Sequence, residues 1–193
     1  MPGLLNMASA DQIDLALATD IAAGTIKAFS LEAEESTRVA DVLALAASAT
    51  NSDIAGIGEA MKYVAPVSQA LKIDLEQTAA AFGALSDANI KGSQAGTVLR
   101  AGLARLANPA KSARKVMDSL GFSAFDAQGN MVPLYEMIGR LQKGTEKLSD
   151  KDRSAAIATI FGQEAMSGFL ALMEQGPERL KGFRGIAKLA RCS

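Results

Sequence analysis

Residues 58–109 read GEAMKYVAPVSQALKIDLEQTAAAFGALSDANIKGSQAGTVLRAGLARLANP, and this stretch decides the fold. It consists of short alanine-rich segments whose apolar residues recur at helical spacing. A helix-breaking or helix-capping signal separates each segment from the next. The signals are Pro66, Asp74 with Gln77, Gly92-Ser93 and Asn108-Pro109. The stretch therefore predicts a series of short helices that follow one another closely.

The same pattern continues on both sides, so we expect helices along almost the whole chain. Their expected ranges are 11–29, 34–49, 53–71, 75–88, 93–106, 110–120, 134–142, 150–161, 163–175 and 177–190. Ser9 or Asp11 is expected to cap the first helix, Asp74 and Gln77 to form a capping box, and Ser149 with Asp152 to cap the helix at 150–161. Pro66 predicts a kink or break near residues 64–65, and Pro109 is placed for a first helical turn.

Residues 122–132 break the helical pattern. Phe122 and Phe125 flank Asp126-Ala127-Gln128-Gly129-Asn130, a turn sequence in which Gly129 supplies a positive φ angle. We expect a small β-hairpin here, packed on helices because an isolated hairpin is only marginally stable. The predicted fold class is all-α, an array of short, mostly antiparallel helices with one small β-hairpin near residues 122–132.

A faint internal repeat supports an array. The run AFSLEAEES at residues 28–36 echoes ALKIDLEQT at residues 70–78, an offset of 42 residues that suits a two-helix repeat unit. Leu120-Gly121-Phe122 opens a third, altered unit in which the hairpin replaces a helix start. Stacked helical hairpins would give an elongated, solenoid-like body. Alanine-rich helices also reach such matches by chance, so the duplication stays a hypothesis.

Composition narrows the function classes. The 193 residues are enough for one domain or two small ones, and 20 basic against 21 acidic residues give no general attraction to nucleic acid or anionic membranes. There is no histidine, and Cys192 alone cannot form an internal disulfide. The longest run without charge lies between Asp41 and Asp53, too short for a transmembrane segment. The core must be aliphatic, with Met61, Met166 and Met173 as expected fillers.

Several motifs hint at chemistry, and each has a simpler structural interpretation. Ser112 and Lys115 fit S-x-x-K, but the companion motifs are missing, so a solvated helix face is favoured. Residues 92–97 suggest a phosphate loop but contain no P-loop lysine, so Gly92 is interpreted as a loop residue and Gly96 as a close contact between helices. The acid pairs Glu34/Glu35 and Asp150/Asp152 lie at helix starts, where carboxylates are stabilised without catalysis.

Two further features are weighed in the same way. Asp126, Gln128 and Asn130 with Glu136 fit a calcium loop only loosely, because the glycine falls two places early and the glutamate one place early, and a hairpin turn is favoured. Residues 178–191 are locally basic and form either a solvated helix end or a contact for an acidic partner or a membrane surface; the charged residues are Glu178, Arg179, Lys181, Arg184, Lys188 and Arg191. No catalytic, cofactor-binding or metal-binding residue is predicted.

Three runs resemble the core region of phage tail tape measure proteins. They are GEAMKYVAPVSQAL at 58–71, LEQTAAAFGALSDANIKGSQAGTVLRAGLARLANP at 75–109 and ATIFGQEAMSGFLALM at 158–173. LGFSAFDAQGNMVPLYEMIGRLQ at 120–142 is similar to the short hairpin and following helix of that family. The likeness extends from about residue 2 to 176, and KGSQAGTVLRAGLARLANP is its most specific part. It contains no catalytic motif, so it implies a scaffold and transfers no active site.

The resemblance implies a structural component of a phage or prophage tail, a fragment of the tape measure protein that sets tail length and scaffolds tail tube assembly. Residues 1–176 would form its helical core region and 177–193 a basic C-terminal segment. Family members are usually far longer, so an excised piece or a truncated prophage gene is expected. The implied partners are other copies and other tail proteins (tail tube, assembly chaperone, baseplate), with no direct sign of nucleic acid.

The implied location is the virion tail, with the bacterial cytoplasm as the place of assembly or of a prophage remnant. Two other function classes stay open. One is a free-standing helical-repeat module that binds a partner protein. The other, least favoured because no site is visible, is a peptidoglycan hydrolase.

Overall fold

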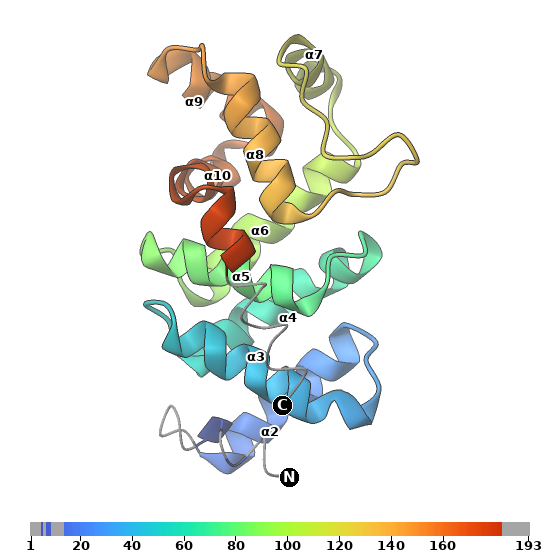
Figure 1. Ribbon diagram of the computed structural model, residues 1–193, viewed down its shortest axis with the longest axis vertical. Helices are drawn as coiled ribbons and strands as arrows, with labels where there is room; N and C mark the ends of the chain where they lie inside the picture. The colour runs from blue at the N-terminus through green and yellow to red at the C-terminus, as the bar shows by residue number, and fades with distance from the viewer. Residues whose placement is uncertain (1–4, 6, 9–13, 183–193) are drawn as a thin grey trace.

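The computed structural model describes residues 5, 7, 8 and 14–182, and within them the chain is all-α, as predicted (Figure 1). The elements are α2 (Leu15–Ala28), the 3₁₀ helix η1 (Ala33–Glu35), α3 (Ser36–Ser48), α4 (Ile54–Ala70), α5 (Leu75–Asp87), α6 (Gly92–Ala107), α7 (Lys111–Ser119), α8 (Leu134–Thr145), α9 (Asp150–Phe161) and α10 (Gln163–Gln175). Residues 177–182 are also helical.

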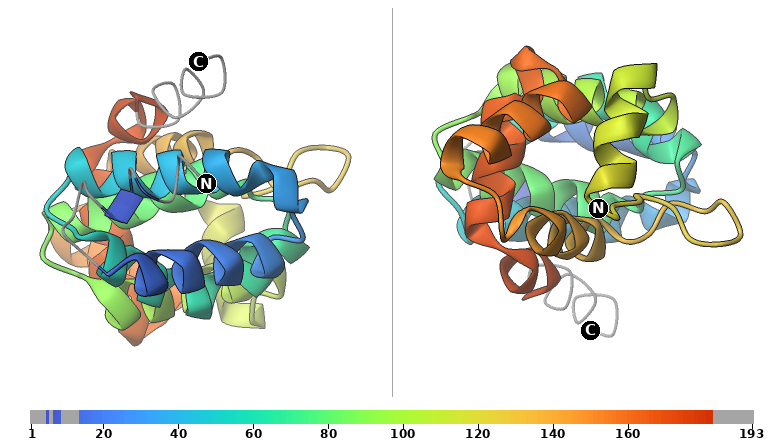
Figure 2. Two further views of the ribbon diagram at one scale, coloured as in Figure 1. Left: turned by 90° about the horizontal axis from the view of Figure 1, so that it is seen from below. Right: turned by 90° about the horizontal axis from the view of Figure 1, so that it is seen from above.

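The helices stack into an elongated body with two layers. In one layer α4 packs between α2 and α6, and in the other α5 packs on α3 and α8. Views along the long axis show these layers on opposite sides (Figure 2). Helix α10 packs against α5, α6, α8 and α9, and α7 packs against α9. Figure 1 places α2 and α3 at one end of the body and α7 and α9 at the other.

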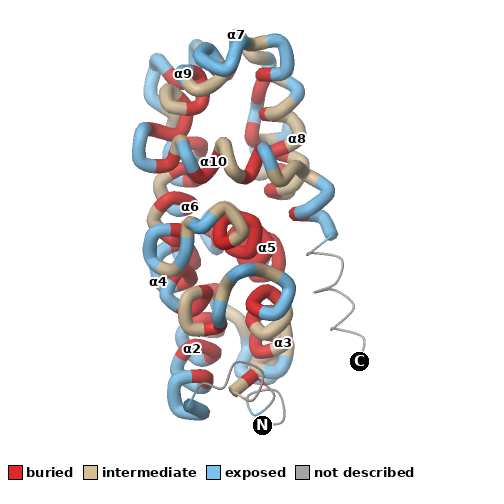
Figure 3. The backbone as a smooth tube through the Cα atoms, turned by 90° about the vertical axis from the view of Figure 1, so that its left-hand side faces the viewer, coloured by how far each residue is buried: buried red, intermediate tan, exposed pale blue. Residues whose placement is uncertain are grey.

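Helix α5 lies at the centre of this arrangement. Every residue from Leu75 to Ser86 is buried, and α5 contacts α3, α4, α6, α8 and α10 (Figure 3). Residues 78–86 carry no charge, which is what a helix enclosed on all sides requires. Small side chains let several neighbours approach α5 at once. The array is therefore organised around one enclosed helix.

Local capping signals placed several helix ends correctly. The Asp74 carboxylate accepts a hydrogen bond from the Gln77 N–H at 2.8 Å, and the Ser149 hydroxyl oxygen accepts one from the Asp152 N–H at 3.1 Å. Helices α9 and α10 have the predicted bounds. Asp14 caps α2, whereas the predicted caps Ser9 and Asp11 lie outside the described residues.

The two prolines do not bound the helices as expected. Of the kink or break expected near residues 64–65, the break is absent, because α4 continues through Pro66. Pro66 and Lys62 are both exposed, so solvent can reach the Lys62 carbonyl, whose usual donor the proline ring removes. Ala110 is the N-cap of α7, which places Pro109 before the helix instead of in its first turn.

The predicted β-hairpin near residues 122–132 is also wrong. The segment is a loop with one isolated antiparallel bridge between Phe125 and Met131, and no strand occurs in the described residues. Its turn is as expected, because Gly129 has a φ angle of +81° and its N–H donates to the Asp126 carbonyl at 3.1 Å. Pairing cannot extend, because Pro133 follows directly and α8 begins after it.

Two turns 42 residues apart have the same backbone geometry, and the internal repeat itself stays a hypothesis. Ser30 and Lys72 both have positive φ angles, 53° and 58°, each just beyond the end of a helix. At each site the N–H of the next residue donates to the carbonyl four residues before the turn residue, at 2.9 and 2.8 Å. The turn after Gly121, in the proposed third unit, has the same bond at 2.9 Å and a φ angle of 58° at Gly121, but Gly121 lies 49 residues after Lys72. Asn89 ends α5 in the same way, also outside the spacing of 42.

Candidate functional site: the helix-stacking interfaces

The groups that suggested catalysis do not converge. Ser112 and Lys115 both lie exposed on α7, as the solvated-face interpretation predicts. Asp150 pairs with Arg153 at 3.5 Å, and the Asp152 carboxylate accepts from the Ser149 hydroxyl at 2.7 Å. Within residues 5, 7, 8 and 14–182, no group of three or more His, Cys, Asp or Glu residues could hold a metal ion.

The loosely calcium-like loop is a hydrogen-bonded turn. The Asp126 carboxylate accepts from the backbone N–H groups of Asn130, at 2.8 Å, and Gln128, at 2.9 Å. These bonds, above all the one from Asn130, hold the pKa of Asp126 below its usual range. Glu136 instead pairs with Arg140 at 2.8 Å. Of the two carboxylates that a calcium loop would need, Asp126 is hydrogen-bonded within the turn and Glu136 is paired within α8.

Glycine allows the closest helix contacts, and it recurs at successive interfaces. A Cβ atom on Gly96 would lie 2.4 Å from the Ala60 carbonyl oxygen, so the backbones of α6 and α4 touch there, as predicted. At the α2–α4 interface, a Cβ on Gly58 would lie 2.8 Å from Ile21. At the α6–α10 interface, Gly102 faces the Phe169 ring. Gly92, expected in a loop, instead begins α6.

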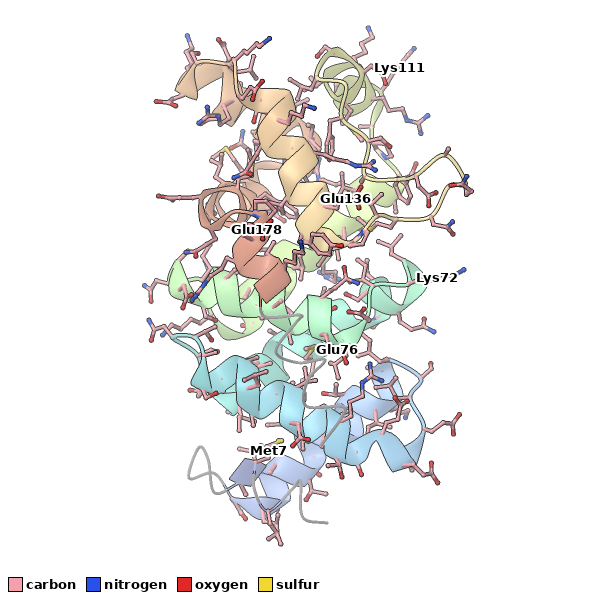
Figure 4. All side chains as sticks on the ribbon, in the orientation of Figure 1. Met7, Lys72, Glu76, Lys111, Glu136 and Glu178 are labelled. Atoms are coloured by element: carbon pink, nitrogen blue, oxygen red, sulfur yellow. The ribbon has the colours of Figure 1, made fainter. Side chains whose placement is uncertain are left out.

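A partly buried ion pair joins α3 to α5. The Arg38 guanidinium donates from Nε to Glu76 Oε1 at 2.8 Å and from Nη2 to Glu76 Oε2 at 2.9 Å (Figure 4 labels Glu76). The Glu76 side chain is 4% exposed, and Glu35 also pairs with Arg38. Hydrogen bonding to Glu76 raises the pKa of Arg38. This bidentate geometry fixes how α3 lies on α5.

Two neighbouring polar residues of α5 tie it to other helices. The Gln77 side-chain oxygen accepts from the Leu134 N–H at 2.8 Å and so satisfies a donor at the start of α8. The Thr78 hydroxyl donates to Ser68 Oγ of α4 at 3.2 Å. The sequence analysis missed these long-range roles because the start of α5 showed only a local capping pattern.

The surface grooves hold no arrangement typical of an active site. One groove of about 550 Å³ lies among α8, α9 and α10, and Leu170 and Met173 are among its lining residues. Glu146 and Glu174 line it from different segments, and Arg153 lines it as well. The chain contains no histidine, the commonest general base near neutral pH, so the groove has no such base to offer.

The three methionines expected to fill the core are buried to different extents. Met61 and Met173 are buried in the core, and Met166 packs against it partly buried.

Among the C-terminal basic residues, Arg179 pairs with Asp87 at 2.6 Å. The remaining basic positions beyond residue 182 and the lone cysteine lie outside the described residues; they are Arg184, Lys188, Arg191 and Cys192. No described helix combines the length and apolar character needed to cross a membrane.

Comparison with known proteins gives a consistent family assignment. A family model described as phage-related minor tail protein matches residues 1–162. The tape measure protein of Pneumococcus phage Dp-1 is 47% identical over 180 residues, which cover 93% of this chain and 16% of that protein. The probable tape measure protein of Escherichia phage P2 is 36% identical over 174 residues, 89% of this chain and 21% of that protein.

The chain thus spans about a sixth to a fifth of the length of these relatives. No solved structure matches it.

Proposed function

The chain belongs to the phage-related minor tail protein family, and from this premise we propose that it is a segment of a phage tail tape measure protein. The observation that carries the proposal is its alignment, over nearly the whole chain, with two tape measure proteins. Its role is structural, since the chain offers stacked helix surfaces and its candidate catalytic residues do not converge. Its location is the virion tail after assembly in the bacterial cytoplasm.

This segment contributes little to tail length itself. An α-helix rises about 1.5 Å per residue, so a single rod converts residue number directly into distance. Among the described residues the longest helix has 17 residues, about 25 Å, and the helices stack side by side instead of end to end. The measuring function would belong to other parts of a full-length protein, and this segment would serve as an assembly and docking module.

The proposed organisation is a core of residues 1–176 with a basic segment at 177–193. The described start of that segment is attached to the core, since Leu180 is buried and Arg179 pairs with Asp87. The proposed partners are other copies of the chain and other tail proteins, among them the tail tube, an assembly chaperone and the baseplate.

Exchange of segments between phages tests the tail role. The aligned segment of the Dp-1 tape measure protein is replaced by this chain carrying an epitope tag. We expect the tag in purified tails, and tails of unchanged length because one compact segment replaces another of similar size. A matched hybrid with Gly96→Leu, which separates α4 from α6, should assemble poorly. Purified tails that form normally but do not contain the tagged hybrid protein would contradict the proposal.

Two measurements address the other function classes. Purified chain incubated with peptidoglycan should release no soluble fragments, and release of fragments would favour the hydrolase. A free-standing binding module would stay in the soluble fraction when tails are isolated from a lysed culture, whereas a tail segment should sediment with them.

A further inference from the structure

One end of the elongated body is acidic. Residues 14–53, which include α2, η1 and α3, contain seven carboxylates and two basic residues. One of those two, Arg38, is already paired with Glu35 and Glu76. Asp20 and Glu34 are exposed. We call this part of the molecule the acidic end.

The opposite end is basic. Helix α7 and residues 143–147, at the end of α8, carry five exposed basic side chains against Asp118 and Glu146; the five are Lys111, Arg114, Lys115, Lys143 and Lys147. The two elements adjoin, because a Cβ on Gly144 would lie 3.0 Å from the Leu120 carbonyl oxygen. Residues 150–153 of neighbouring α9 are balanced, with two acids and two bases. We call α7 with residues 143–147 the basic end; Figure 4 shows Lys111 there.

Helix α2, at the acidic end, has exposed apolar side chains. Leu15 and Leu17 are 44% and 43% exposed on it, while Met7, which Figure 4 labels at the same end, is buried against the core. Ala16 lies 42 residues before Gly58, the position where α4 packs closely on Ile21 of α2. Ala16 is exposed. Helix α2 thus has an exposed small residue of the kind that a close helix contact uses elsewhere in this stack.

We propose that the acidic end of one copy of this chain docks on the basic end of a second copy. The interface is heterologous, so it leaves one acidic and one basic end open and can repeat along a line. Leu15 and Leu17 supply apolar contact, and the opposite charges set the orientation. The proposal specifies the self-association included in the proposed function, and because its test uses the purified chain alone, its failure leaves the tail role standing.

Sedimentation velocity of the full chain over a range of concentrations gives the first test. Exposed charges are screened over about 10 Å at 0.1 M salt and about 3 Å at 1 M. We expect the mass to rise with concentration at about 0.05 M salt and the apparent Kd to weaken at least about tenfold at about 0.5 M. A chain that stays monomeric at every concentration in low salt would overturn the proposal.

Charge reversal tests the two ends. Asp20→Lys with Glu34→Lys changes the net charge of the acidic end from −5 to −1, and Lys111→Glu with Lys115→Glu changes that of the basic end from +3 to −1. Each double variant alone should self-associate at least about tenfold more weakly, whereas an equimolar mixture of the two should associate. Chains that associate as tightly alone as the wild type would refute the interface.

A control variant shows that the effect belongs to the ends. Lys72→Glu with Arg100→Glu changes the same amount of charge at exposed positions just after α4 and on α6, between the two ends (Figure 4 labels Lys72). It should retain the self-association of the wild type, with circular dichroism confirming that every variant is folded. Loss of association in this control equal to that of the end variants would show a general charge effect and reject the docking surfaces.

Discussion

Gly96 and Gly24 form a matched pair that tests the stacking of α4 on α6. Both lie within helices, and each is replaced by alanine. A Cβ at position 96 would lie 2.4 Å from the Ala60 carbonyl oxygen and 2.9 Å from its Cα, whereas nothing lies within 4 Å of a Cβ at position 24. The two substitutions make the same covalent change, so their difference isolates the helix contact.

The expected free energies have opposite signs. Alanine in place of glycine stabilises a helix interior by about 0.8–1 kcal/mol, so Gly24→Ala should raise the free energy of unfolding by about that amount. Gly96→Ala gains the same term but must push two backbones apart by about 1 Å, and overpacking costs about 1–3 kcal/mol or more. Because backbone atoms lie on both sides of the contact, we expect a net loss of about 2 kcal/mol.

Urea unfolding followed by circular dichroism at 222 nm measures both changes, with the slope against urea showing whether the surface exposed on unfolding stays the same. For a chain of this length, 1 kcal/mol shifts the Tm by about 2–4 °C. Gly96→Ala should therefore melt lower than wild type and Gly24→Ala higher. Equal gains in stability for both variants would mean that α4 and α6 do not touch at Gly96.

Three other substitutions test the polar contacts. Glu76→Leu leaves the Arg38 guanidinium without its main partner and should lower the free energy of unfolding, measured in urea, by about 3 kcal/mol. Adding Arg38→Met should restore most of that loss, and a double variant no more stable than Glu76→Leu would contradict a direct pair. Gln77→Ala should cost about 1–2 kcal/mol and accelerate hydrogen exchange at the Leu134 N–H, and unchanged exchange would count against that bond. Because the pKa of Asp126 is lowered in the folded state, ionised Asp126 stabilises the fold above its ordinary pKa, and this stabilisation is lost as pH falls through the lowered pKa. Asp126→Asn should therefore lower the Tm at pH 7, and the difference from wild type should shrink steadily as the pH is lowered into the acid range. A difference that does not change with pH would refute this.

Where the sequence carried a local signal, the helix bounds followed from it. Ser149 begins α9, and Gly162 and Gly176 end α9 and α10 with φ angles of 86° and 81°, which glycine adopts at little cost. Such signals act within a few residues of the backbone they control, so one sequence reveals them. The same reasoning identified Gly129 as the turn residue of the loop after α7.

The predictions that were wrong or missing concern features that depend on contacts with other parts of the folded chain. Pro66 is tolerated because it lies on an exposed side of α4, and the sequence does not state which side that is. The loop at residues 122–132 has a hairpin turn, but Pro133 and α8 follow it directly and its pairing does not extend beyond one bridge. Glu76 meets Arg38 across 38 residues, a separation for which helical periodicity gives no expectation.

These long-range contacts bear on how the proposed end-to-end docking would work. Glu76, Gln77 and Thr78 occupy consecutive positions of α5, yet they bond to α3, α8 and α4 respectively. The acidic end contains α3 and the basic end contains the last residues of α8, so one turn of α5 is bonded to helices of both ends. Loss of Gln77 should then weaken docking without changing any charge on the two surfaces, because the angle between the ends would vary from copy to copy. A Gln77→Ala chain that stays folded and self-associates as tightly as the wild type would show that α5 does not set that angle.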